Sequence, residues 1–229
     1  MKPSTLRTLV LLTALLIGVG FALVFFYASN EADQGFIQKI FYLHVPLAMC
    51  SLAGFVIGGI FAIAHLRTGR SIYVVRSYVS IHLSVIFGVA VLLTGSIWAK
   101  ASWGKWWVWD EPTLVSFLIV FLLYACYQPL RFSIEDPERQ ARYAAVFSVI
   151  AGAFVPLNFV AVRLAQAFTH PRVLSATGGN MPGSMRLTFV AAIGAIALLY
   201  ITLWRIEIAS KETSGELRRL RRRLAEAAS

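Results

Sequence analysis

The sequence predicts an all-α fold, a polytopic membrane protein built as a bundle of six transmembrane helices. Of its 229 residues, 58% are hydrophobic and only 14% are charged, with a mean hydropathy of +0.71, whereas soluble domains carry about a quarter charged residues. Six apolar runs approach or exceed the roughly 20 residues that cross a hydrocarbon core about 30 Å thick. Because lipid cannot satisfy free backbone groups, each run is expected to be a helix.

The first run, residues 7–28, follows Lys2 and Arg7. This basic start resembles that of a signal peptide, but the apolar stretch exceeds the usual length of roughly 7 to 15 residues, so we expect a retained helix. The five later runs span residues 38–66, 77–98, 113–130, 143–165 and 187–208.

The connections between the runs are short, and no soluble domain or fixed-period repeat interrupts them. We therefore expect one membrane domain over residues 1–210, with an outward tryptophan-rich loop at residues 99–112. Residues 211–229 form a basic tail in which Leu217, Leu220 and Leu224 share one helical stripe. Such a segment suits anionic lipid, a cytoplasmic ATPase surface, or simple solvation as an amphipathic helix.

The charge distribution predicts the orientation in the membrane. The net charge is +10, and the 21 Lys and Arg residues collect in alternate connections. Fifteen of them lie at the N-terminus, in the second and fourth connections, and in the tail, and six lie on the other side: Lys39, Lys100, Lys105, Arg163, Arg172 and Arg186. The positive-inside rule then places both termini in the cytoplasm. This alternation argues for membrane topology, and against nucleic acid, as the reason for the basic composition.

Two histidines lie on the predicted outer side. His44 follows the start of the second run in Phe41-Tyr-Leu-His-Val-Pro46, and His170 lies in a loop beyond the fifth run. Ionisable groups inside a membrane are costly and often functional, although a packed, hydrogen-bonded His44 and a solvated His170 are the plain alternatives. Of the others, His65 is expected at the inner interface, and His82 either packs with a hydrogen bond or contacts a proton path or second cofactor.

The segment Trp103-Gly-Lys-Trp-Trp-Val-Trp-Asp110, called here the tryptophan-rich segment, holds four of the six tryptophans. If it is helical, Trp103, Trp106 and Trp107 share one face and Trp109 neighbours Trp106. An interfacial aromatic belt is the alternative, but belts are distributed over many helix ends. Asp110 is expected either to cap the next helix or to fix an indole or ligand by hydrogen bonding.

Haem would use each of these residue types. Its flat face suits indole rings, its iron takes imidazole nitrogen on two sides, and its propionates need cations. The candidate cations on the outer side are Arg163, Arg172 and Lys105, with Lys100 and Arg186 as further possibilities. Arg163 has snorkelling to the interface as its simpler role.

The tryptophan-rich segment resembles the WWD signature of haem-handling membrane proteins. Tyr42-Leu-His-Val-Pro46 and Thr169-His-Pro171 resemble the flanking histidine elements of the CcmC type, and the resemblance covers most of the chain. It implies that His44 and His170 are axial ligands of the haem iron. It also implies that Trp103, Trp106, Trp107, Trp109 and Asp110 form the surface for haem and its receiving chaperone.

The resemblance further implies a role in cytochrome c maturation in the bacterial inner membrane, with the site facing the periplasm. The cargo is haem b, and the partners are ABC transporter subunits of the CcmA and CcmB type, a small CcmD-type subunit and the CcmE-type haem chaperone. The family signature usually continues with an arginine two places after its aspartate, where this chain has Pro112. A basic partner is therefore expected elsewhere, for example at Lys105.

Two other functional classes stay open from sequence. One is a membrane cytochrome with permanently bound haem, for which His82 would need an in-bundle partner, and the other is the permease subunit of a small-molecule exporter. Cys50 and Cys126 both lie in apolar runs and form no Cys-x-x-Cys pair, which indicates small packing groups. No nucleophile or acid–base pair stands out, and no phosphate-binding loop is present. We therefore expect a carrier, and not an enzyme.

Overall fold

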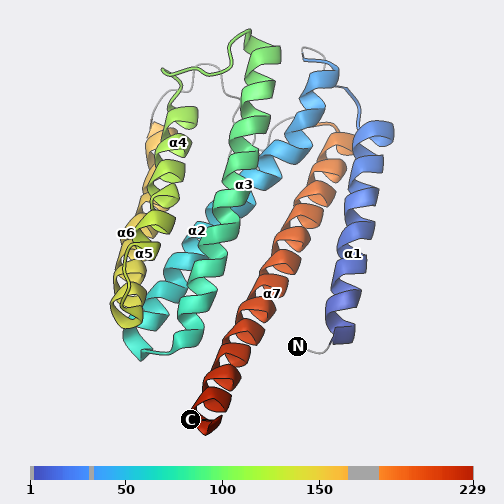
Figure 1. Cartoon of the computed structure of the whole chain (residues 1–229). Coiled ribbons are helices and arrows are strands. Elements are labelled where there is room, and N and C mark those ends of the chain that lie inside the picture. The colour runs from blue at the N-terminus through green and yellow to red at the C-terminus, as the bar shows by residue number, and fades with distance from the viewer. Residues whose placement is uncertain (1–2, 31–33, 165–180, 229) are drawn as a thin grey trace.

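The computed structural model describes residues 3–30, 34–164 and 181–228, and these residues form helices without a β-strand (Figure 1). Six segments are long and apolar enough to cross a membrane, which confirms the all-α, six-span prediction. The elements are α1 (Pro3–Ala22), the π-helical turn η1 (Leu23–Tyr27), the 3-10 turn η2 (Phe36–Ile40), α2 (Phe41–Thr68), α3 (Ser71–Trp103), α4 (Pro112–Ala125), α5 (Tyr127–Phe132), α6 (Pro137–Leu164) and α7 (Gly183–Ala228).

The two ends of the chain lie at the same end of the bundle, as an even number of spans requires (Figure 1). We call this the inner end. The start of α2, the connection from α3 to α4 and the start of α7 lie at the opposite end, called here the outer end (Figure 1). The sidedness of these ends in the membrane stays a prediction from the distribution of basic residues.

Two element boundaries differ from the sequence prediction. The fourth run is divided at Cys126 into α4 and the short α5, with Pro129 within the first turn of α5. Pro129 lacks a backbone N–H, so it cannot continue the hydrogen-bond ladder of α4. The last helix is longer than the sixth apolar run, because α7 continues without interruption from Gly183 through the basic tail to Ala228.

The helices α2 and α3 form the centre of the bundle. Helix α2 crosses it obliquely, so that its start lies near α1 and α7 and its end near α5 and α6 (Figure 1). One core cluster joins α2 and α3 to α4, α5 and α6, with Phe55 stacked on Tyr124 at a ring separation of 3.8 Å. A second joins α2 and α3 to α7, and a third fills the outer end around Phe41 and Trp98.

Buried hydroxyl groups connect the helices inside this apolar bundle. The Tyr200 hydroxyl of α7 lies 3.0 Å from the Ser84 hydroxyl and donates to the Ser80 carbonyl of α3 at 2.8 Å. Trp204 Nε1 donates to Ser80 Oγ at 2.9 Å. Polar groups without partners are costly in lipid, so these paired groups specify how α7 is positioned against α3.

Candidate functional site

His44 lies at the outer end, where α3 supports it. It is the fourth residue of α2 and is half-buried. Its Nδ1 lies 3.0 Å from Thr94 Oγ1, and its ring meets the Trp98 ring edge-on at a centroid distance of 5.8 Å. A Cβ at Gly95 would lie 2.8 Å from His44 Cε1, so glycine allows the close approach of the imidazole to α3. The imidazole is therefore held by one turn of a neighbouring helix.

Trp98 forms a wall beside His44. It is 7% exposed, its Nε1 donates to Gln34 Oε1 at 2.9 Å, and its ring packs edge-on against Phe41 at 6.4 Å. Trp98 and Thr94 are not among the site residues predicted from sequence, because both lie inside an ordinary apolar run. Their spacing of four residues, which places them on one face of a helix, was the available signal.

The tryptophan-rich segment is not helical beyond Trp103, so the condition under which Trp103, Trp106 and Trp107 would share one helical face is not met. Helix α3 ends at Trp103, and Gly104 adopts a left-handed conformation with φ of 73° while its N–H bonds to the Lys100 carbonyl at 3.1 Å. This is a glycine-type helix stop. Pro112 then begins α4, which leaves residues 104–111 as an irregular connection.

The four indoles of this segment are consequently in unlike environments. Trp106 is 60% exposed and Trp109 is 73% exposed, whereas Trp103 and Trp107 are half-buried. The predicted neighbour pair was Trp106 with Trp109, but the structure instead pairs Trp107 with Trp109 at a ring separation of 6.0 Å. Trp107 Nε1 is buried and has no hydrogen-bond partner in the part of the chain that the structure describes.

The start of α4 also differs from the expectation for Asp110. Asp110 is exposed and makes no hydrogen bond to the described residues, and the residue at the N-cap position is Glu111. Glu111 is 1% exposed, and its carbonyl accepts from the N–H of Val115 at 3.2 Å. The prediction that Asp110 caps the helix is therefore wrong, because the chain becomes helical one residue later. A role of Asp110 toward a ligand stays a prediction.

The candidate cations divide by what they contact. Lys105 and Arg186 are exposed at the outer end, and Lys100 donates from Nζ to the Gly104 carbonyl at 2.9 Å. Arg163 belongs to the last turn of α6, where the structure describes the backbone alone. His170 and Arg172 lie outside the described residues, so the second axial ligand and its neighbouring cation stay predictions.

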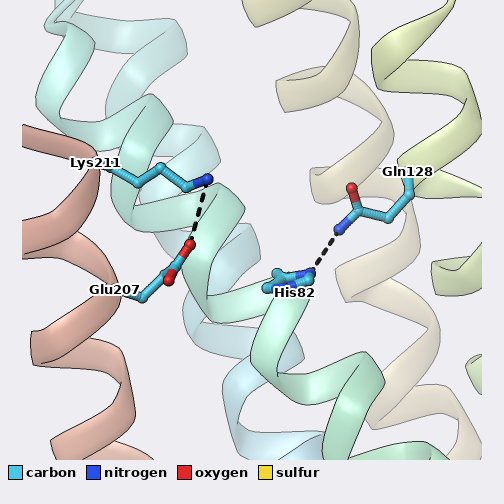
Figure 2. Close-up of polar contacts among 4 residues, drawn as sticks. All are labelled: His82, Gln128, Glu207 and Lys211. Atoms are coloured by element: carbon cyan, nitrogen blue, oxygen red, sulfur yellow. Dashed lines mark hydrogen bonds and ion pairs between the residues drawn. The ribbon is translucent and has the colours of Figure 1, made fainter. Parts of the chain in front are cut away.

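The remaining histidines lie toward the inner end. His82 Nδ1 lies 3.1 Å from Gln128 Nε2 of α5 (Figure 2). The His82 ring stacks on the Tyr78 ring at a centroid distance of 5.7 Å. This bears out a hydrogen-bonded packing role. His82 precedes Thr94 by twelve residues, about 18 Å along α3, so it does not share a site with His44. His65 is half-buried, and its Nδ1 lies 3.3 Å from the Arg70 carbonyl.

The outer end therefore combines one positioned imidazole, two exposed indoles and exposed basic groups. Toward the inner end, by contrast, the lysine Lys211 is paired: its Nζ lies 3.3 Å from Glu207 Oε1 within α7 (Figure 2). A planar apolar ligand that carries a nitrogen-binding metal and acidic substituents fits the outer set by chemistry. The unpartnered N–H of Trp107 adds one buried donor for an acidic substituent.

Comparison with known proteins gives a consistent result. Residues 1–223 match the family described as CcmC, "Heme exporter protein C". The chain is 29% identical over 202 residues to the "Heme exporter protein C" of Paracoccus denitrificans, a match covering 87% of this chain and 80% of that protein. It is 31% identical over 180 residues to the protein of the same name from Bradyrhizobium diazoefficiens, covering 77% and 67%. A cytochrome c biosynthesis ccmC-like mitochondrial protein of Marchantia polymorpha is 30% identical over 158 residues, covering 69% and 66%.

Proposed function

The chain belongs to the CcmC family of heme exporter C proteins, and we propose that it binds haem at the outer end of its bundle for cytochrome c maturation. The observation that carries the proposal is the His44 imidazole, held by Thr94 and Trp98 at the end of the bundle where Trp106 and Trp109 are exposed. Imidazole is a common axial ligand of haem iron, and indole rings suit its apolar faces.

In this proposal haem b is a cargo. His44 and His170 bind the iron, the tryptophan-rich segment contacts the macrocycle, and Arg163, Arg172 or Lys105 bind the propionates. Two ligands far apart in the sequence favour release, because displacing the segment that carries His170 breaks one axial bond without unfolding the bundle. Trp106 and Trp109 are exposed, as surfaces that meet a second protein must be. The chain holds and transfers haem and catalyses no reaction.

The partners in this proposal follow from the family. The receiving protein is a CcmE-type chaperone on the periplasmic side of a bacterial inner membrane, and the chain assembles with CcmA-type and CcmB-type transporter subunits and a CcmD-type subunit.

A cytochrome with permanently bound haem is less favoured, because the His82 ring is packed on Tyr78 and hydrogen-bonded to Gln128.

The test is an optical spectrum of the detergent-purified chain produced with haem available. We expect a Soret band with low-spin features in the native protein, and weaker or shifted bands in both His44→Ala and His170→Ala. His65→Ala is the matched control, because His65 is a half-buried histidine at the inner end, bonded to the Arg70 carbonyl, and it should keep the native spectrum. Absence of haem from the native protein would contradict the proposal and favour the exporter-subunit alternative.

The two ligand variants also separate the assignments. An unchanged spectrum in His44→Ala alone would remove His44 from the site, while an unchanged spectrum in His170→Ala alone would leave His44 in place and require another second ligand. Delivery is measured separately, by mixing the haem-loaded chain with haem-free CcmE-type chaperone and following the haem spectrum in each protein after separation.

A further inference from the structure

We infer that Thr94 is a positioning residue that selects the His44 tautomer with its proton on Nδ1 and its lone pair on Nε2. The inference rests on the proposed function, since it concerns how the iron ligand is prepared. It begins from a hydrogen bond between two helices: Thr94 Oγ1 on α3 lies 3.0 Å from His44 Nδ1 on α2.

The direction of this hydrogen bond follows from the threonine's other contacts. Thr94 Oγ1 lies 2.7 Å from the Ala90 carbonyl and 3.2 Å from the Val91 carbonyl, both of which can only accept. A hydroxyl has one proton, and that proton is committed to the carbonyls. Toward His44 the Thr94 oxygen therefore acts as acceptor, and the imidazole must supply the proton from Nδ1.

The consequence concerns the other ring nitrogen. A neutral imidazole carries one proton, so a proton on Nδ1 leaves the lone pair on Nε2. Histidines that bind metals ordinarily donate their second N–H to an acceptor, which sets the tautomer and increases the basicity of the ligating nitrogen. Thr94 supplies that acceptor without a charged group, in a membrane segment where a carboxylate would be costly.

Two neighbours of Thr94 restrict the orientation of the imidazole ring. Gly95 leaves no spare room on one side, since a Cβ there would meet His44 Cε1 at 2.8 Å. Trp98 presents its ring edge-on at 76°, and its own position is fixed by the hydrogen bond to Gln34. Turning the imidazole to present Nδ1 as the ligand would break the bond to Thr94, so the packing and the hydrogen bond select the same nitrogen.

The experiment compares Thr94→Val, which removes the acceptor with little change in shape, with Thr94→Ser, which keeps it. Thr188→Val is the matched control: Thr188 is a buried threonine whose hydroxyl, like that of Thr94, bonds to the carbonyl four residues earlier, at 2.8 Å. The first readout uses haem-free full-length protein labelled with ¹⁵N-histidine, with His44 assigned by comparison with His44→Ala. We expect the Nδ1–H tautomer in the native protein and Thr94→Ser, and a mixture of tautomers in Thr94→Val.

The second readout is the rate at which the loaded protein loses haem to an excess of an apo-globin scavenger. Loss of an outer-sphere partner typically costs about 10- to 100-fold in metal affinity, so Thr94→Val should lose haem faster by that factor, and its midpoint potential should rise because the ligand is less basic. Thr94→Ser and Thr188→Val should match the native protein.

The outcomes distinguish this inference from the proposed function. Haem binding by the native protein together with native tautomer, native loss rate and native potential in Thr94→Val would overturn the role of Thr94 and leave the haem site standing. An Nε2–H tautomer in the native haem-free protein would also overturn it. Failure of the native protein to bind haem would instead overturn the proposed function. If Thr94→Val does not fold, the tautomer of the native protein and the rate of haem loss from Thr94→Ser remain as tests. The inference then requires the Nδ1–H tautomer in the native protein, and it requires Thr94→Ser to lose haem at the same rate as Thr188→Val.

Discussion

Gly95 is the residue at which the smallest change should disturb the His44 site. A methyl group there would overlap the imidazole, with 2.8 Å to Cε1, and overpacking of this kind costs about 1–3 kcal/mol. We expect Gly95→Ala to lower the ratio of haem to protein after purification, because the ring must move away from Thr94. Gly194→Ala is the control, since a Cβ at Gly194 in α7 would meet nothing within 4 Å. Equal haem ratios in the two variants would show that His44 tolerates displacement.

Replacing the tryptophans at the outer end should change either the free energy of unfolding or haem binding, depending on whether the indole is buried or exposed. Trp98 is buried and hydrogen-bonded, so Trp98→Ala should lower the free energy of unfolding by about 3–5 kcal/mol. Trp106 and Trp109 are exposed, so their replacement by Ala should change it by less than about 0.5 kcal/mol while reducing haem retention or transfer.

The measurements for this prediction are thermal unfolding and the haem ratio in the same detergent. Phe36→Ala is the control, because Phe36 is an exposed aromatic residue, 64% accessible, outside the tryptophan-rich segment. If Trp106→Ala, Trp109→Ala and Phe36→Ala all keep native haem retention and transfer, the exposed indoles serve as membrane anchors.

At the scale of elements, Lys39 joins the end of the first span to the start of the second. It is 9% exposed, and its Nζ donates to the Val24 carbonyl at 2.6 Å and the Ala28 carbonyl at 3.3 Å. These carbonyls belong to the π-helical turn η1 and the residue after it, where the normal i to i+4 pattern has ended. The ammonium group therefore fixes η2, the turn that leads into α2 and its residue His44, against the end of the first span.

We expect Lys39→Met to reduce the free energy of unfolding by about 1.5–3 kcal/mol, the range for hydrogen bonds to charged groups. The carbonyls of Val24 and Ala28 would lose their buried donor. Thermal unfolding in detergent measures the change, and Lys105→Met is the control because Lys105 is exposed. A Lys39→Met variant as stable as Lys105→Met would mean that water or lipid headgroups replace the ammonium.

The α3 to α4 connection illustrates a second effect at this scale. Gly104 ends one helix and Pro112 begins the next, so the tryptophans between them cannot form a common helical face. The exposure of each indole therefore depends on its own local backbone conformation and not on a shared helical face. Trp106 and Trp109 are exposed, and the Trp107 ring packs against Trp109 with its N–H directed into the protein.

At the scale of the whole molecule, α7 is longer than the bilayer requires. Its 46 residues correspond to about 69 Å at 1.5 Å per residue, against about 40–45 Å for a bilayer with its headgroups. The end of the helix extends past the bundle at the inner end (Figure 1). Leu217, Leu220 and Leu224 are exposed on this extension, and a position flat on anionic lipid would require a bend that α7 lacks.

The orientation of the bundle is tested by cysteine labelling. In a Cys50→Ala, Cys126→Ala background, we expect Lys105→Cys to react with a membrane-impermeant maleimide in intact spheroplasts. Arg70→Cys, at the opposite end, should react only after permeabilisation, because the basic connections face the cytoplasm. Both native cysteines are free, and Cys126 is exposed, so they must be removed first. The reverse labelling pattern would place the tryptophan-rich segment in the cytoplasm.

The sequence by itself determined the helical class, the number of spans and the location of both termini at one end. These properties depend on local quantities: the length of each apolar run, and the requirement that backbone groups in lipid bond within their own helix. His44 and the tryptophan-rich segment were also recognisable, because an imidazole in an apolar run and four clustered indoles stand out without any knowledge of packing.

Only the tertiary structure decided what surrounds them. Thr94 is separated from His44 by fifty residues, and nothing in the run of residues 77–98 distinguishes it from a threonine that bonds only to its own helix. The contact depends on the rotation and vertical offset of α3 against α2, which Gly95 permits at one position. Interhelical registry is set by all packed side chains together, so the acceptor that orients His44 could be identified only after the helices were placed.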